Sequence, residues 1–343
     1  MADPLPQDPL STAFAVAAEL QAERGKALGN AARNGHLDIL RQLIADGAPV
    51  DFQDALGETA VMEAVRAQQY EAAELLLNAK ANPDIANHVP IPPLALAVTL
   101  GDHKMAEILL RHGANPDLPA DLSITPMQTA AEAGDDAMLT LLLDYKAKTE
   151  IRDAGGHTAL MIAAMNGHIS TVRLLHARGA VIDIRNDDHV SPLDHSISKG
   201  NDAMFDTLLE LRADITQGGP RKMPPLLRAA QAGNTYAMRK LLDGKAARDA
   251  LTPEGETALI LAAASGSVAT GQMLIDAGIS IDAKDLSGRD ARKVALASGH
   301  AGFVDLLDRE HARYLQSAMQ DGMKGRGAAA PKRASFRRGG PKS

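Results

Sequence analysis

Cysteine and tryptophan are absent from this 343-residue chain, and aromatic residues make up only 3% of it. Without cysteine the chain has no disulfide, no thiolate metal site and no cysteine nucleophile. The scarcity of rings argues against one large globular core, because rings supply much of the buried area in such cores. The apolar fraction is still 45%, and its alanine, leucine, isoleucine and methionine suit thin layers of short, closely packed helices.

Long apolar runs are also missing. The first ten residues, MADPLPQDPL, contain two aspartates and three prolines and lack the basic start and apolar stretch of a signal peptide. No stretch approaches the roughly 20 apolar residues that a membrane-spanning helix needs. We therefore expect a cytoplasmic protein without membrane contact.

Positive charge is scarce except at one end. The net charge is −7, yet residues 316–343 contain seven basic residues and one acidic residue. Residues 1–315 contain 29 basic and 42 acidic residues, which makes them a poor general ligand for nucleic-acid phosphates. The basic end is rich in glycine, alanine and proline, and we expect it to be disordered from residue 316 onward.

What the chain does have is a 33-residue period. Acidic residues hold it as a ladder that is broken only at Thr216, and its members are Asp51, Asp84, Asp117, Glu150, Asp183, Asp249 and Asp282. Glycines follow the same step at Gly35, Gly101, Gly134, Gly167, Gly200, Gly233, Gly266 and Gly299. A period held without slippage over this length indicates a repeat protein.

The segment 155–183 illustrates one unit. Thr158 is a suitable N-cap for a first helix over 159–166, which Gly167 ends. A second helix over 169–178 follows and ends before Gly179, which supplies a left-handed conformation. Its apolar side is formed by Val172, Leu174 and Leu175. Two helices of this size cannot bury their apolar faces alone, so we expect the units to be stabilised by stacking.

These residues resemble the ankyrin repeat. The opening of its motif is matched by GETA at 57–60, ITPM at 124–127, VSPL at 190–193 and GETAL at 255–259, and its end by LLRHGAN at 109–115. The resemblance implies an all-α solenoid of stacked helix-turn-helix units with hairpin loops over residues 19–315. Nine units are implied, starting near residues 19, 52, 85, 118, 151, 184, 217, 250 and 283. Residues 1–18 would begin a capping helix.

The chain departs from the family's motif at two positions. The motif histidine is replaced by Met62, Ala95, Gln128, Met161, Asp194, Leu227 and Ile260, so we expect its hydrogen bonds to be missing and packing to replace them. The glycine that ends the second helix is replaced by Lys80, Lys146, Arg212 and Lys245. A side chain in that left-handed conformation costs about 1 kcal/mol.

Candidates for chemistry are few. His36, His168 and His300 share one register, and we expect each to start or cap a second helix. The cluster most like a metal site combines Asp187, Asp188, His189, Asp194 and His195, but aspartate is ordinary at hairpin tips. No nucleophile elbow, zinc-protease helix, phosphate loop or dinucleotide-binding turn occurs. We predict no catalytic residue, no metal and no cofactor.

The resemblance places protein binding on the hairpin tips and on the concave side beside the first helices. One position on this side is the residue directly before the threonine, serine, proline or aspartate that opens each first helix. In the family this residue varies and is normally exposed. Along the chain this column reads Glu58, Ile91, Ile124, His157, Val190, Met223, Glu256 and Arg289. Apolar residues at its centre and charged residues at its ends are typical of an interface core and rim.

We therefore predict a protein-binding scaffold or adaptor that is monomeric and binds a protein partner on this concave side. The partner-binding candidates are Ile91, Ile124, His157, Val190 and Met223, together with nearby Val89, Leu122 and Met165, and further Leu96 and Ile162. In the alternative interpretation, the column residues fill spaces between neighbouring hairpins.

The basic end leaves several functions open. It could solubilise the protein, contact nucleic acid or another polyanion through residues 324–343, contact an acidic partner or the acidic array itself, or carry a regulatory site. Ser335 follows Lys332, Arg333 and Ala334 and resembles a phosphorylation site of basophilic kinases. The alternative function is thus an adaptor whose basic end touches nucleic acid while the array holds a protein.

Overall fold

The computed structural model describes residues 9–121, 123–216, 223–244 and 246–324, with side chains between residues 16 and 317 of those ranges. The described residues form 18 α-helices and no β-strand, only isolated bridges between Ala120 and Ile124 and between Lys284 and Asp290. The all-α repeat architecture expected from the sequence is confirmed. The chain divides into two compact units, Met1–Pro225 and Leu226–Ser343.

The first unit consists of one long helix followed by helix pairs. The long helix is α1 (Pro9–Asn34), and α2 (Leu37–Ala45) follows it. The pairs are α3 (Ala60–Arg66) with α4 (Tyr70–Asn78), α5 (Pro93–Thr99) with α6 (His103–Arg111), α7 (Pro126–Ala133) with α8 (Asp136–Asp144), α9 (Ala159–Asn166) with α10 (Ile169–Ala177), and α11 (Pro192–Lys199) with α12 (Asp202–Glu210).

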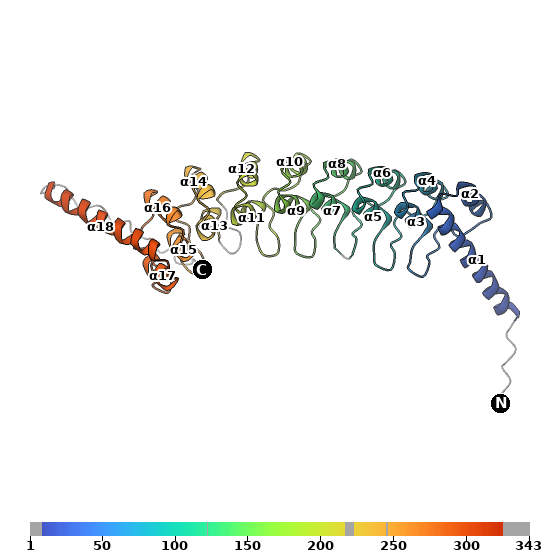
Figure 1. The fold of residues 1–343 in the computed structure, drawn as a ribbon, viewed down its shortest axis with the longest axis horizontal. Coiled ribbons are helices and arrows are strands. Elements are labelled where there is room, and N and C mark those ends of the chain that lie inside the picture. The colour runs from blue at the N-terminus through green and yellow to red at the C-terminus, as the bar shows by residue number, and fades with distance from the viewer. Residues whose placement is uncertain (1–8, 122, 217–222, 245, 325–343) are drawn as a thin grey trace, which may run out of the picture. The chain divides into compact units, whose positions relative to one another are not determined.

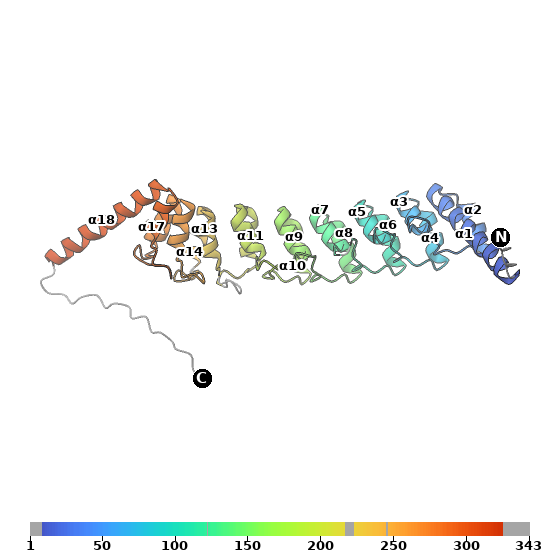
Figure 2. The same ribbon diagram turned by 90° about the horizontal axis from the view of Figure 1, so that it is seen from below.

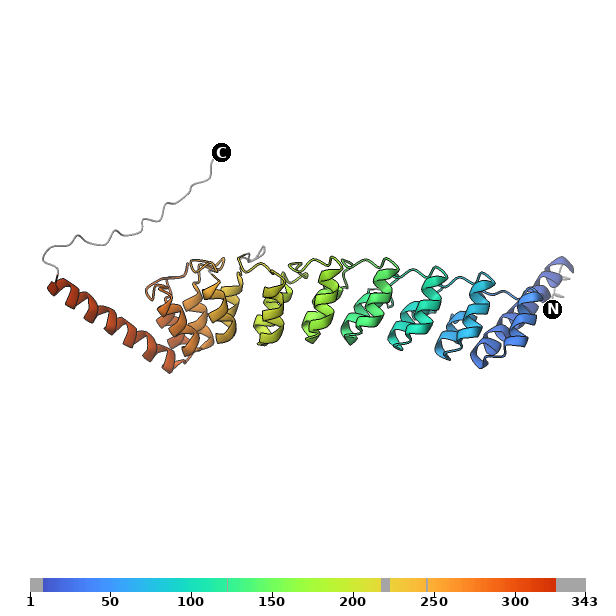
Figure 3. The ribbon, with the colours of Figure 1, turned by 90° about the horizontal axis from the view of Figure 1, so that it is seen from above.

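Within this unit the helices form two rows. The first helices of the pairs make one row and the second helices make the other, and a hairpin loop projects beyond the first row between successive pairs (Figure 1). Seen at right angles, the pairs stand side by side in the same orientation (Figures 2 and 3). Neighbouring first helices pack against each other, as do neighbouring second helices.

Four of the five first helices from α3 to α11 begin at a threonine or serine whose hydroxyl caps them, whereas α5 begins after Pro92 without a side-chain cap. The Thr158 side chain accepts a hydrogen bond from the Met161 N–H, and the helix ends at Gly167 in a left-handed conformation with φ 79°. Both ends are therefore where the sequence predicted them. Ala159 and Ala163 are buried, as are the small residues at the same positions of the other first helices. These small side chains let neighbouring helices approach closely.

The acidic ladder joins consecutive turns. In the first unit each carboxylate of the ladder accepts the backbone N–H of the residue 31 positions later, in the next turn. The pairs are Asp51 with Asn82 (2.8 Å), Asp84 with Asn115 (2.9 Å), Asp117 with Lys148 (2.8 Å), Glu150 with Val181 (2.9 Å) and Asp183 with Asp214 (2.9 Å). The period of the acidic residues is thus the period of these clamps.

The second unit contains α13 (Pro225–Ala232), α14 (Thr235–Asp243), α15 (Ala258–Ser265), α16 (Val268–Asp276), α17 (Ala291–Ala297) and α18 (Ala301–Lys324). Helix α15 packs on α17, and α16 packs on α18. Phe303 and Leu306 of α18 are fully buried in this packing.

The helices nearest the two ends of the chain differ from our expectations. The capping helix and the first helix of the unit at residue 19 are one continuous helix, α1, whose Gly25 lies where a Cβ would clash with the Phe52 ring at 2.2 Å. At the other end, α18 continues to Lys324, so disorder from residue 316 onward was wrong for residues 316–324. Alanine, methionine, glutamine and lysine are good helix formers and extend the helix there.

Three of the four residues that replace the glycine after the second helix adopt the left-handed conformation. Lys80 and Lys146 have φ of 69° and Arg212 has φ of 65°, whereas Lys245 lies outside the described residues. A glycine would adopt this backbone without steric cost.

We predict that Lys80→Gly together with Lys146→Gly raises the free energy of unfolding by about 1 kcal/mol per site, because the left-handed strain is removed. Urea unfolding followed by circular dichroism measures this. Lys148→Gly is the matched control, since Lys148 has no positive φ. A glycine there adds freedom to the unfolded chain and removes the exposed ion pair with Asp117, so it should lower the stability. A double variant no more stable than the wild type would contradict the prediction.

Candidate functional site

The surface of interest is formed by the hairpins and first helices of the first unit, and we call it the hairpin face. In the described residues, side chains of the predicted column differ in exposure along it. Ile124 is 42% exposed, Ile91, His157 and Val190 are half-buried, and Glu58 is buried at 8%. Our expectation that this position is exposed was therefore wrong for Glu58 and holds fully at Ile124.

The next hairpin explains the burial. The Asn87 side-chain amide donates to the Glu58 carboxylate at 3.0 Å, and Arg66 donates to the same oxygen at 2.7 Å. Three repeats (99 residues) later the same contact recurs, where the Asn186 side-chain amide donates to Nε2 of His157 at 3.0 Å. The column residue of one repeat thus lies under the hairpin of the following repeat.

A second ladder, which our sequence analysis missed, closes the hairpins. A side-chain oxygen of the residue near the start of the hairpin accepts backbone N–H groups from inside the same hairpin. The residues that do this in the two units are Asp54, Asn87, Asp153, Asn186, Thr252 and Asp285. Their 33-residue spacing, with Ala120 and Gly219 as the exceptions, was the signal that could have revealed them.

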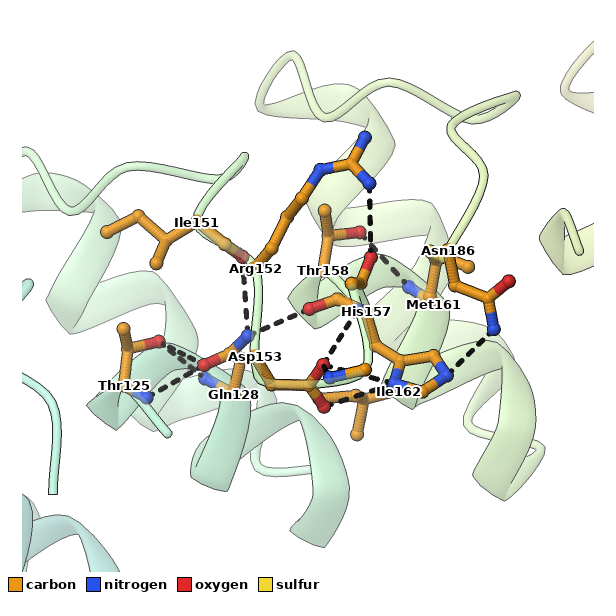
Figure 4. Close-up of polar contacts among 12 residues, drawn as sticks. Thr125, Gln128, Ile151, Arg152, Asp153, His157, Thr158, Met161, Ile162 and Asn186 are labelled. Carbon is orange, nitrogen blue, oxygen red and sulfur yellow. Dashed lines mark hydrogen bonds and ion pairs between the residues drawn. The ribbon is translucent and has the colours of Figure 1, made fainter. Parts of the chain in front are cut away.

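His157 is held by this hairpin network (Figure 4). Its backbone N–H donates to Asp153 at 2.8 Å, and its ring Nδ1 lies 3.1 Å from the same carboxylate. Because Nε2 accepts from Asn186, the proton of the neutral ring is on Nδ1 and points at Asp153. With both ring nitrogens engaged and 22% of its side chain exposed, His157 orders two adjacent hairpins.

The expected loss of hydrogen bonds at the replaced motif histidine was wrong at two positions. The Gln128 side chain accepts a hydrogen bond from the Thr125 N–H at 2.7 Å and donates one to the His157 carbonyl at 2.9 Å. The Asp194 carboxylate accepts hydrogen bonds from the Ser191 N–H at 3.1 Å and from the Arg185 guanidinium at 2.5 Å. Buried apolar residues stand at the other positions, Met62, Ala95, Met161, Leu227 and Ile260.

The three histidines that share one register cap or precede second helices. His36 and His168 are the N-cap residues of α2 and α10, and α18 begins directly after His300. Nε2 of His168 bonds the Glu132 carbonyl at 2.9 Å and so joins adjacent repeats.

The five residues of the metal-like cluster are not brought together. Asp194 is completely buried against Arg185, whereas Asp187 and Asp188 are exposed at the hairpin. In the part of the chain that the structure describes, no group of three histidine, aspartate or glutamate residues could hold a metal.

Exposed apolar side chains remain on the hairpin face in four successive repeats. Leu56 is 69% exposed in the hairpin before α3, Val89 is 62% exposed in the hairpin before α5, Ile124 is 42% exposed before α7, and Met165 is 42% exposed on α9. Ile162 is half-buried one turn from Met165, while Leu96 is buried at 9%. Val89, Ile124 and Met165 were predicted from the sequence, whereas Leu56 was not.

Three predicted positions lie elsewhere. Met223 is half-buried just before α13, at the boundary with the second unit, and Leu122 lies outside the described residues. Ser335 and the basic residues after Lys324 also lie outside them. No helix among the described residues is long and apolar enough to cross a membrane.

Comparison with protein families matches nearly the whole chain. A family model for ankyrin repeats, in three copies, matches residues 13–88, 127–219 and 220–316, and a model for a single ankyrin repeat matches residues 92–121. No curated protein matches the chain.

The Asp153 carboxylate gives the hairpin network a pH dependence. Burial alone would raise the pKa of this carboxyl, but hydrogen bonds from the N–H groups of His157 and Gly155 and from the His157 ring lower it below its ordinary value. A lowered pKa stabilises the fold above the unfolded value of about 3.9, and this stability is lost as the pH falls through the folded value.

We therefore expect Asp153→Asn to lower the free energy of unfolding by about 1 kcal/mol at pH 7 and to flatten its decline below about pH 4. Urea unfolding at a series of pH values measures both effects. Asp188→Asn, at an exposed aspartate of the next hairpin, should keep the wild-type profile. Parallel profiles for the wild type and Asp153→Asn would refute this role of the carboxylate.

Proposed function

This chain belongs to the ankyrin repeat family, whose repeats generally mediate protein–protein interactions, and we propose that it is a non-catalytic scaffold that binds a protein partner on the hairpin face of its first unit. The observation that carries the proposal is the set of exposed apolar side chains, Val89, Ile124 and Met165, on that face. Apolar side chains left in water on a repeat surface favour contact with a partner.

Charge defines the partner further. Residues 1–225 contain 31 acidic and 18 basic residues, so the unit is strongly acidic. Asp121 and Glu132 lie exposed near Ile124 in the chain, on the hairpin and at the end of α7. An apolar centre with acidic surroundings favours a partner segment that combines apolar anchors with lysine or arginine, and attraction between opposite charges speeds their encounter.

The half-buried members of the column have a different part in this proposal. Ile91, His157 and Val190 present only part of their side chains, and His157 is fixed by Asp153 and Asn186. They would set the shape of the surface, while Ile124 and Met165 would supply the area that a partner covers. A rigid surface loses little conformational entropy on binding.

We predict that Ile124→Asp combined with Met165→Asp weakens partner binding at least tenfold and leaves thermal unfolding nearly unchanged, because both side chains are already partly in water. Quantitative affinity purification with each variant as bait, followed by circular dichroism melting, measures the two properties. Ile39→Asp with Val181→Asp is the matched control, since these exposed apolar residues lie away from the hairpin face on α2 and after α10.

The control pair should retain the proteins that the wild type captures. If the Ile124/Met165 variant captures the same proteins in the same amounts, the binding surface lies elsewhere. If that variant unfolds at a much lower temperature, the two side chains are packing residues and the proposal fails.

A further inference from the structure

The second unit contains a groove of about 570 Å³ between α18 and the turn that follows α16. Ile275, Ile279 and Ile281 form one wall, and Glu310, Arg313 and Tyr314 of α18 form the other. The isoleucines are half-buried, and Tyr314 is 68% exposed. Apolar surface is therefore open to water here, within a single unit and apart from the hairpin face.

The first unit shows what this groove corresponds to. An equivalent groove lies 132 residues, four repeats, earlier, lined by Leu143, Lys148, Glu150 and Arg178 among others. There the Glu150 carboxylate accepts the Val181 N–H at 2.9 Å, and Arg178 pairs with Asp144 at 3.0 Å. The carboxylate of this groove is a member of the acidic ladder, and the backbone of the next turn occupies it.

In the second unit that carboxylate has no such partner. Asp282 holds the ladder position, but the residue 31 positions later, Arg313, lies inside α18, where its N–H bonds within the helix. Among the described residues no donor contacts the Asp282 carboxylate, and Asp282 is exposed. Five carboxylates at this position in the first unit bind a backbone N–H. In the second unit neither Asp249 nor Asp282 receives this bond among the described residues, and Asp282 differs from Asp249 because the residue 31 positions later lies in a helix, so Asp282 is an open acceptor.

One charge of the groove also changes sign. In the first unit Arg178 pairs with Asp144, whereas the equivalent positions of the second unit, Glu310 and Asp276, are both carboxylates. Arg313 balances part of this charge through its bond to Glu310 at 2.6 Å. The groove thus combines an apolar wall, an excess of negative charge and an open acceptor for a backbone N–H. These features fit an extended basic segment that carries an apolar side chain.

Residues 325–343 have this chemistry. They contain six basic residues, no acidic residue and one aromatic, Phe336. Lys324 lies ten residues after Tyr314, which is about 15 Å along the helix, and a 19-residue segment extends to about 60 Å, so the segment can reach back to the groove. Linkage to α18 also gives it a high effective concentration there.

We propose that residues 325–343 fold back and occupy this groove of the same chain, with Phe336 against the isoleucine wall, the basic side chains near Glu310 and Asp282, and a backbone N–H donated to Asp282. At Asp282 the segment would donate the backbone N–H that the turn of the next repeat supplies at Glu150. A phosphate on Ser335 would add negative charge beside these carboxylates and release it. The proposal is independent of the binding function of the hairpin face.

The test compares the full chain with a chain that ends at Lys324. A fluorescent peptide of residues 325–343 should bind the shortened chain at least tenfold more tightly than the full chain, where the groove is already occupied. Asp282→Asn with Glu310→Gln in the shortened chain should weaken the peptide about tenfold. Amide hydrogen exchange should be slower at 278–284 in the full chain than in the shortened one.

Asp188→Asn with Glu254→Gln is the control, because it removes the same charge from exposed sites outside the groove and should leave peptide affinity unchanged. Equal peptide affinity for both chain lengths overturns the proposal. So does equal binding of a scrambled peptide, which would mean charge attraction alone. Protection that rises with protein concentration, or that falls within residues 9–216, also overturns it, because the segment would then bind a second copy or the first unit.

Discussion

The structure depends on the shortness of its helices. The paired helices of the first unit have seven to nine residues, and an isolated helix shorter than about 12 residues is marginal in water. Each pair can therefore be stable only against its neighbours. This explains why alanines such as Ala163 are fully buried between first helices, and why the few aromatic residues are sufficient for a core made of thin layers.

Stacking alone would allow neighbours to slide, and the polar ladders set the register. Carboxylates such as Glu150 clamp the next turn, and side chains such as Asn186 close one hairpin while binding the previous one. Carboxylates such as Asp84 and Asp153 are occupied in this way. The two surfaces that we propose to bind lie where apolar side chains are exposed or where a ladder carboxylate lacks such a partner.

Two such places have different character. On the hairpin face, Ile124 and Met165 are exposed within an otherwise regular first unit whose net charge is strongly negative. In the second unit, Asp282 continues the ladder, but α18 runs on where a turn would lie. The first place offers apolar area to a partner, and the second offers an unused backbone acceptor among carboxylates.

The 33-residue period determined the fold class, the caps at Thr158 and Gly167, and the left-handed Lys80 and Lys146, because these depend on local backbone chemistry that each repeat restates. The binding candidates could be predicted only as a column, since exposure depends on what the following repeat places over each residue. The tertiary structure alone decided that Asn87 and Asn186 cover Glu58 and His157, while Ile124 remains in water. It also decided that Gln128 and Asp194 make hydrogen bonds where the motif histidine is replaced, because the Ile151 and His157 carbonyls lie 23 and 29 residues from Gln128 and Arg185 lies nine residues from Asp194.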